Sequence, residues 1–158
     1  MIRKIKQSDK NVLEEMLNNI PTFTGDEVRV AMELINIAVT ITEQTDYNIF
    51  VYEEKNNILG YHCTGKRPLT DAVYDLYWIV VDVNYQGKGI GEKLLQHAKN
   101  FVNKKKGRWL LIETSSVDNY QKTRNFYTQN NFEVISKIQD FYKVNDDLII
   151  YGKKFNNI

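Results

Sequence analysis

The stretch "QGKGIG", residues 86–91, places three glycines within five positions, between an apolar run and an amphipathic pattern. A glycine inside a helix costs roughly 1 kcal/mol relative to alanine, so three glycines where a helix should begin need a structural reason. The free N–H groups and the dipole of a helix N-terminus attract an anion, and missing side chains let phosphate oxygens approach the backbone. The pattern therefore favours a phosphate-binding turn over a turn with incidental glycines.

The two commonest phosphate-binding motifs do not fit this stretch. A dinucleotide-binding GxGxxG motif that starts at Gly87 needs a third glycine where Glu92 stands. A P-loop, GxxxxGK[ST], matches neither the spacing nor the terminal Ser or Thr. Both motifs are therefore poor fits to this stretch.

Hydrophobic periodicity predicts an α/β fold with a mixed sheet and helices on its faces. Strands are expected near residues 1–5, 47–54, 58–66, 73–81, 109–115, 132–138 and 147–155. Helices are expected after an N-cap at Ser8, after a capping box at Thr24, after the glycine turn up to a stop at Gly107, and near 120–130. Asn131 stands where a left-handed cap would end the last helix. The order is β-α-α-β-β-β-α-β-α-β-β, about seven strands and four helices, in a single domain of residues 1–158.

Composition and charge argue against several classes of protein. Twenty-one Lys and Arg residues against twenty Asp and Glu residues leave a net charge of +1, so we expect no nucleic-acid partner. The longest apolar run, residues 76–81, is too short to span a membrane, and the charged N-terminus does not resemble a secretory signal. The lone Cys63 cannot form an internal disulfide, which fits a reducing cytoplasm, and the two histidines and one cysteine do not form a metal site.

Two separated motifs resemble those of the GNAT superfamily of N-acetyltransferases. Gln86, Gly89 and Gly91 reproduce its Q/R-x-x-G-x-G/A signature, and "WIVVDVNYQGKGIGEKLL" resembles its fourth strand, pyrophosphate loop and third helix. Downstream, "RNFYTQNNFEVI" resembles its "FYxxxGF" segment, with Asn131 where glycine usually stands. "DFYKVNDDLIIYGKK" resembles the closing hairpin of one GNAT subgroup, so the resemblance covers essentially the whole chain.

The resemblance implies that acetyl-CoA is the phosphate ligand and co-substrate. In the family the fourth and fifth strands splay apart, and the pantetheine arm lies between them on exposed backbone. The residues that the resemblance places at the cofactor are Val81, Val83, Gln86, Gly87, Lys88, Gly89, Ile90, Gly91 and Asn119. No metal is implied. The partners are acetyl-CoA and an amine acceptor, with a homodimer left open.

For the chemistry, the resemblance matches Tyr127 to the tyrosine that protonates the departing thiolate. Glu113 ends the fifth long strand and is our candidate for the general base, ahead of Asp75. The structural alternatives are a half-buried tyrosine and carboxylates that bond neighbouring chain segments. Acetyl transfer would be direct, without a protein nucleophile.

The implied activity is transfer of acetyl to a primary amine of a small molecule, amino acid or peptide. The alternatives are a non-enzymatic acyl-CoA-binding module and a nucleotide-binding regulatory domain that uses the same turn for another phosphate ligand. Neither the segment between the first two helices nor the third strand carries the dense acidic cluster that would indicate a polyamine or aminoglycoside acceptor. The aromatic residues that could frame an acceptor pocket are Phe23, Tyr74, Tyr77 and Trp78. Strand alternation places Tyr77 and Trp78 on opposite faces, so at most one set can do so.

Overall fold

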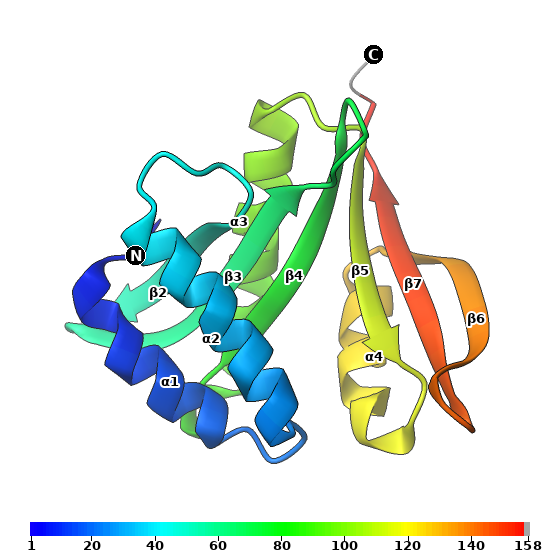
Figure 1. Ribbon diagram of the computed structural model, residues 1–158, viewed down its shortest axis with the longest axis horizontal. Coiled ribbons are helices and arrows are strands. Elements are labelled where there is room, and N and C mark those ends of the chain that lie inside the picture. Colours follow the sequence, from blue (N-terminus) through cyan, green and yellow to red (C-terminus); the bar gives the residue numbers. More distant parts are fainter. Residues whose placement is uncertain (157–158) are drawn as a thin grey trace.

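The computed structural model describes residues 1–156. Within them, a seven-stranded sheet has the strand order β1-β2-β3-β4-β5-β7-β6, and four α-helices lie against it (Figure 1). The strands are β1 (Ile2–Lys4), β2 (Asn48–Glu54), β3 (Asn57–Lys66), β4 (Val73–Val81), β5 (Trp109–Ser115), β6 (Glu133–Lys143) and β7 (Asp146–Lys154). The helices are α1 (Lys10–Asn18), α2 (Gly25–Thr40), α3 (Ile90–Lys104) and α4 (Gln121–Gln129). The predicted fold class and element order are confirmed.

The sheet is split between β4 and β5. These two strands run parallel, whereas the other neighbouring strands of the described sheet run antiparallel. Their ladder joins only residues 73–75 to residues 109–111, and beyond it the strands diverge into the V-shaped separation seen in Figure 1. Leu76 and residues 78–81 of β4 therefore pair with β3 and have no strand partner on the β5 side.

A β-bulge in β4 lies where the two strands begin to part. Cys63 pairs with Trp78, but the next residue of β3 pairs with Leu76, so Tyr77 is an extra residue. Because a bulge breaks the alternation of side chains, Tyr77 and Trp78 pack against the same apolar cluster. The prediction that these two aromatic residues point to opposite faces is therefore wrong.

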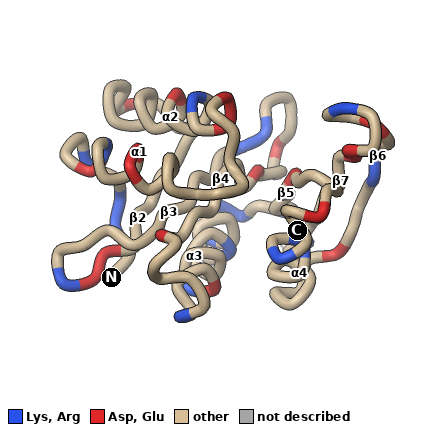
Figure 2. The backbone as a smooth tube through the Cα atoms, turned by 90° about the horizontal axis from the view of Figure 1, so that it is seen from below, with Lys and Arg blue, Asp and Glu red and all other residues tan. Residues whose placement is uncertain are grey.

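Helices cover both faces of the sheet, as the end view in Figure 2 shows, with α1 and α2 on one side and α3 and α4 on the other. Amphipathic helices bury one apolar face, and each fully buried leucine contributes about 1.5–3 kcal/mol. The first helix pair buries Leu13, Met16, Leu17, Ala31, Met32 and Ile35 against β2, β3 and β4. The opposite face buries Leu95, Ala98, Val102, Leu110, Ile112 and Tyr127.

The start of α2 agrees with the sequence prediction, and the start of α1 does not. Thr24 accepts a hydrogen bond from the Glu27 backbone N–H at 3.2 Å, and the Glu27 carboxylate accepts one from the Thr24 N–H at 2.7 Å. Ser8 lies inside a short 3₁₀ turn, Gln7–Asp9, and the N-cap of α1 is Asp9. The Asp9 carboxylate is held by the Arg3 guanidinium at 2.7 Å, so it does not cap α1.

The residues that follow α3 and α4 include one each with a left-handed backbone conformation. Asn131 has a φ of 63°, as predicted. After α3, Lys106 rather than Gly107 takes the left-handed conformation, with a φ of 56°. Gly107 is required by packing instead, because a Cβ there would lie 2.4 Å from Cγ1 of Val102.

Candidate active site

The glycine turn before α3 is open at two of its glycines. Gly87 and Gly89 have φ values of 72° and 78°, a left-handed conformation that glycine adopts without strain. A Cβ at Gly87 would meet no atom within 4 Å, and one at Gly89 would meet only the Glu92 carboxylate at 4.0 Å. The turn therefore presents bare backbone to open space at the N-terminus of α3, which suits a phosphate group.

The third glycine of the turn has a different role. A Cβ on Gly91 would lie 3.3 Å from Cζ of Phe126, a residue of α4. Gly91 therefore allows the first turn of α3 to approach α4 closely. The sequence motif contains both kinds of glycine, and only the structure separates them.

Side chains around the turn are anchored to local backbone. The Gln86 amide donates to the Val81 carbonyl at 3.3 Å, at the end of β4. The Lys88 ammonium donates to the Asn84 carbonyl at 3.2 Å. Val83 lies in a short 3₁₀ turn just past the strand, whereas Val81 is its last residue. The turn thus sits directly at the end of the unpaired edge of β4.

Tyr127 of α4 lies in the aromatic core behind the split. It is 5% exposed, and its ring centroid lies 5.7 Å from that of Phe126, 6.2 Å from that of Phe132 and 5.7 Å from that of Tyr151. Burial, with a smaller contribution from Tyr151, raises the pKa of Tyr127 well above its usual range. The phenol therefore keeps its proton at neutral pH, which a general acid requires.

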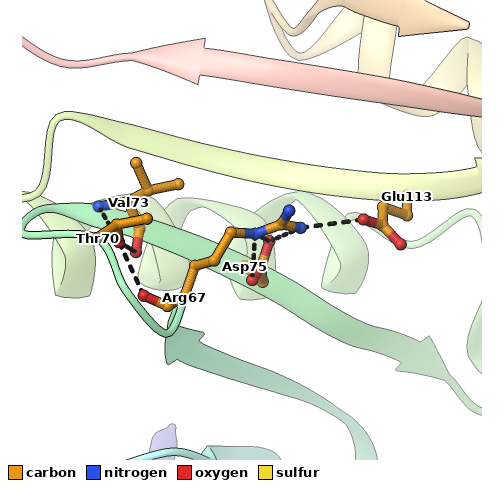
Figure 3. Close-up of polar contacts among 5 residues, drawn as sticks. All are labelled: Arg67, Thr70, Val73, Asp75 and Glu113. Carbon is orange, nitrogen blue, oxygen red and sulfur yellow. Dashed lines mark hydrogen bonds and ion pairs between the residues drawn. The ribbon is translucent and has the colours of Figure 1, made fainter.

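Both predicted base candidates bond to one guanidinium, Arg67 (Figure 3). Arg67 donates to both carboxylate oxygens of Asp75, at 2.7 Å from Nη2 and 3.0 Å from Nε, and to Oε1 of Glu113 at 3.0 Å. Hydrogen bonding to Asp75 raises the pKa of Arg67 and outweighs the opposing effect of burial. Asp75 and Glu113 lie on β4 and β5 beside the point of divergence, so this cluster marks the closed end of the split.

Arg67 was not predicted from the sequence. It follows β3 in a loop whose shape is fixed by Thr70, which donates from its hydroxyl to the Arg67 carbonyl at 2.8 Å. The same hydroxyl accepts from the Val73 N–H at 3.3 Å. No local sequence pattern predicts that this loop places Arg67 against the carboxylates of Asp75 and Glu113 on the neighbouring strands β4 and β5.

Polar side chains from distant elements gather on the α2 side of the split. The Tyr120 hydroxyl, in the 3₁₀ turn Asp118–Tyr120, donates to Oε1 of Glu27 on α2 at 2.6 Å. Burial raises the pKa of Tyr142 on β6, and the charges of Glu113, Asp146 and Glu27 raise it further. The three acidic residues Glu27, Glu113 and Asp146 come from α2, β5 and β7 respectively. No continuous segment of the sequence carries all three. Asn119, beside Tyr120 in the same turn, is exposed.

In residues 1–156, no helix is both long and apolar enough to cross a bilayer. Nor do three or more His, Cys, Asp or Glu side chains gather there in an arrangement that could hold a metal ion.

Comparison with known proteins identifies the family. Residues 45–134 match the acetyltransferase (GNAT) domain. A GNAT-family protein from Desulfovibrio desulfuricans is 31% identical to this chain, with a TM-score of 0.92 and 98% of each chain covered. The fold and this match define an acetyltransferase, and the chain belongs to the GNAT family. No functionally curated protein matches the sequence at a significant level.

Two more distant structures share the fold. The ribosomal-protein-S18-alanine N-acetyltransferase of Escherichia coli is 18% identical, with a TM-score of 0.74 and coverage of 100% of this chain and 97% of that chain. The protein yncA of Salmonella typhimurium, solved with its cofactor acetyl-CoA, is 16% identical, with a TM-score of 0.75 and coverage of 100% and 95%.

Proposed function

We propose that the protein transfers the acetyl group of acetyl-CoA directly to a primary amine of a small molecule, amino acid or peptide. The observation that carries this proposal is the position of the open turn at Gly87 and Gly89, at the end of the unpaired edge of β4. A pyrophosphate on the turn leaves the rest of a CoA molecule free to extend along that edge. The Salmonella typhimurium protein of the same fold was solved with acetyl-CoA, which supports the assignment.

The backbone supplies most of the proposed cofactor contacts. N–H groups of residues 86–91 would hold the pyrophosphate, and backbone groups of Val81 and Val83 would bond the pantetheine arm. The hydrogen bonds to the pyrophosphate are charge-assisted, and hydrogen bonds to charged groups contribute about 1.5–3 kcal/mol each. An N–H on the free edge of β4 would also stabilise the negative charge that develops on the thioester oxygen.

Glu113 is the proposed base and Tyr127 the proposed acid. An amine acceptor arrives protonated and must lose that proton before it attacks the thioester. Glu113 bonds Arg67 through Oε1, and its side chain is 44% exposed, so it can receive the proton directly or through water. Asp75 bonds Arg67 through both oxygens and is 11% exposed, which makes it the weaker candidate. Tyr127 would protonate the CoA thiolate.

We also propose a cytoplasmic location. Cys63 is the sole cysteine of the chain, and it is fully buried in β3. Burial raises the pKa of its thiol well above the usual range, so it remains a reduced, unreactive core residue. A chain whose sole cysteine is a buried thiol suits a reducing compartment such as the cytoplasm.

Calorimetric titration with acetyl-CoA, CoA, NAD and ATP tests the ligand, and a panel of amines assayed by release of free CoA tests the reaction. We expect acetyl-CoA and CoA to bind and NAD and ATP not to bind. Tight acetyl-CoA binding without turnover of any amine would favour the acyl-CoA-binding alternative. Absence of acetyl-CoA binding would contradict the proposal.

A further inference from the structure

Two hydrogen bonds cross the split on its α2 side, one at the closed end and one at the open end. At the closed end Arg67, which follows β3, donates to Oε1 of Glu113 on β5 at 3.0 Å (Figure 3). Ile112 packs into the cluster on the α3 side, so its neighbour Glu113 faces the α2 side. At the open end the Tyr120 hydroxyl donates to Oε1 of Glu27 at 2.6 Å. Two strands and two hydrogen bonds therefore frame the opening on this side.

The Tyr120–Glu27 hydrogen bond, which we call the strap, joins the two halves of the split sheet. Helix α2 packs on β2, β3 and β4, whereas the turn Asp118–Tyr120 follows β5. Figure 1 shows that α2 begins, and β5 ends, at the wide end of the V. The strap therefore crosses the split at the end where the two strands leave the most room.

The α2 end of the strap is fixed by two further contacts. The other carboxylate oxygen of Glu27, Oε2, accepts from the Thr24 backbone N–H at 2.7 Å. Phe23, just before this cap, packs edge-to-face on Trp78 of β4, with ring centroids 5.4 Å apart. Both oxygens of the carboxylate are thus bonded, and the start of the helix is tied to β4.

The Tyr120 end of the strap is held by a buried guanidinium. Arg124 of α4 is 8% exposed and donates to the carbonyls of Ser115 and Val117 at 2.8 Å each. The Tyr120 backbone N–H donates to the same Val117 carbonyl at 3.0 Å. Burial, followed by the bond to Glu27, raises the pKa of Tyr120, so the phenol remains a donor at neutral pH. The strap is therefore closed between two anchored ends before any acceptor arrives.

We propose that the acceptor is a compact amine that fits between the strap and Arg67, and that Tyr120 sets the upper limit on its size. This inference rests on the proposed acetyl transfer. A cofactor on the glycine turn lies at the N-terminus of α3, so the acceptor approaches from the opposite, α2 side. A peptide carries further residues behind its reactive amine, and those residues need the wide end of the V, which the strap occupies. Tyr120 acts on access to the site and takes no part in proton transfer.

Paired acceptors test this size limit. One pair is an amino acid amide and the tripeptide amide with the same first residue. The other is a short alkyl diamine and an N-terminally blocked tripeptide amide that contains lysine. Amides are used because the carboxylates of Glu27 and Glu113 would repel a free carboxylate on the acceptor. Release of free CoA gives kcat/KM for each member, and the wild type should favour the smaller member by about tenfold or more.

Two variants open the strap in different ways. Tyr120→Phe removes the donor, and Glu27→Gln removes the charge of the acceptor atom but keeps the capping box. Each should lower the preference for the smaller member, by about tenfold for Tyr120→Phe, because a hydrogen bond to a charged group shifts an equilibrium by about that factor. A packing defect would lower kcat/KM for both members alike and leave their ratio unchanged. Tyr52→Phe, which removes a hydroxyl from β2, is the control and should keep the wild-type ratio.

Urea denaturation of the same proteins tests the strap without any acceptor. Tyr120→Phe should lower the urea midpoint of the wild type and lower that of Glu27→Gln by less. Additive effects of the two substitutions would overturn the proposal, and so would an unchanged size preference in a folded Tyr120→Phe protein. A wild type that acetylates small amines and peptides equally well would keep the proposed function and refute this inference. A wild type that acetylates neither would refute both.

Discussion

The guanidinium of Arg67 lies 3.0 Å from Oε1 of Glu113 while bonding both oxygens of Asp75, at the point where β4 and β5 part. One cation thus serves a carboxylate from each of the diverging strands. Arg67 bonds both carboxylate oxygens of Asp75, whereas it bonds only Oε1 of Glu113 and leaves the other carboxylate oxygen of Glu113 outside this contact (Figure 3). This difference makes the two predicted base candidates experimentally separable.

Replacement of Glu113 by Gln should lower kcat/KM most at neutral pH. An alkyl amine has a pKa near 10.4, so without a base only its small neutral fraction reacts. Activity should approach that of the wild type as the pH rises toward the pKa of the amine. The measurement is a pH–rate series with an acceptor found in the amine screen. Asp75→Asn is the comparison, and a wild-type profile for Glu113→Gln would move the base to Asp75 or to water.

Replacement of Tyr127 by Phe should reduce kcat by roughly 10²-fold, the low end of general-acid effects, because a thiolate is already a fair leaving group. Acetyl-CoA affinity should be nearly unchanged. Higher pH should not restore activity, because hydroxide does not replace a missing acid. Tyr151→Phe is the matched control, since its ring lies 5.7 Å from that of Tyr127 in the same cluster. Equal loss in both variants would indicate a packing effect and remove Tyr127 from the chemistry.

Replacement of Gly89 by Asp should abolish acetyl-CoA binding in calorimetry. The carboxylate would enter the open space above the turn and repel a phosphate. Gly89→Asn separates charge from backbone strain, because Asn also tolerates the left-handed conformation, and it should bind more tightly than the Asp variant. Lys88→Ala should have a smaller effect than Gly89→Asp, because backbone groups carry most of the proposed contact.

The control for the glycine variants is Gly25→Asp. Gly25 is the first residue of α2, a Cβ there meets nothing within 4 Å, and an acid is favourable at a helix N-terminus. This variant should bind acetyl-CoA like the wild type. Unchanged affinity in a folded Gly89→Asp protein would refute the pyrophosphate assignment.

Stability should fall as the pH is lowered from about 6.5 toward 3 because of His62. Its ring is fully buried, bonds Thr64 at 3.0 Å and His97 at 2.9 Å, and burial, with a smaller effect of His97, lowers the pKa of His62 to about 3. Between these pH values the unfolded state binds more protons, so acid favours unfolding. The loss at pH 5 should be ~2 kcal/mol, with full stability above pH 6.5.

Urea denaturation at several pH values measures this dependence, and His62→Gln removes the group that causes it. The variant should show a flatter dependence between about pH 6.5 and pH 5 than the wild type, whatever its stability at neutral pH. Equal slopes for the two proteins would show that His62 is not the titrating group.

The sequence alone determined the elements of this protein and its family. Apolar periodicity gave the seven strands and four helices in order, since burial of one face is a local property of a strand or helix. The glycine turn was visible because the left-handed conformations at Gly87 and Gly89 demand a particular residue type at each position. Features that depend only on neighbouring residues in the chain, such as these, can be predicted from the sequence.

Tertiary structure alone decided which distant residues meet. The bulge at Tyr77 could not be predicted, because its cause is the register between two strands rather than a local preference. Arg67 reaches Glu113 across 46 positions, and Tyr120 reaches Glu27 across 93. Such contacts depend on the order of the strands in the sheet and on the point where β4 and β5 diverge. The hydrophobic periodicity of one segment does not predict which other segment it will contact.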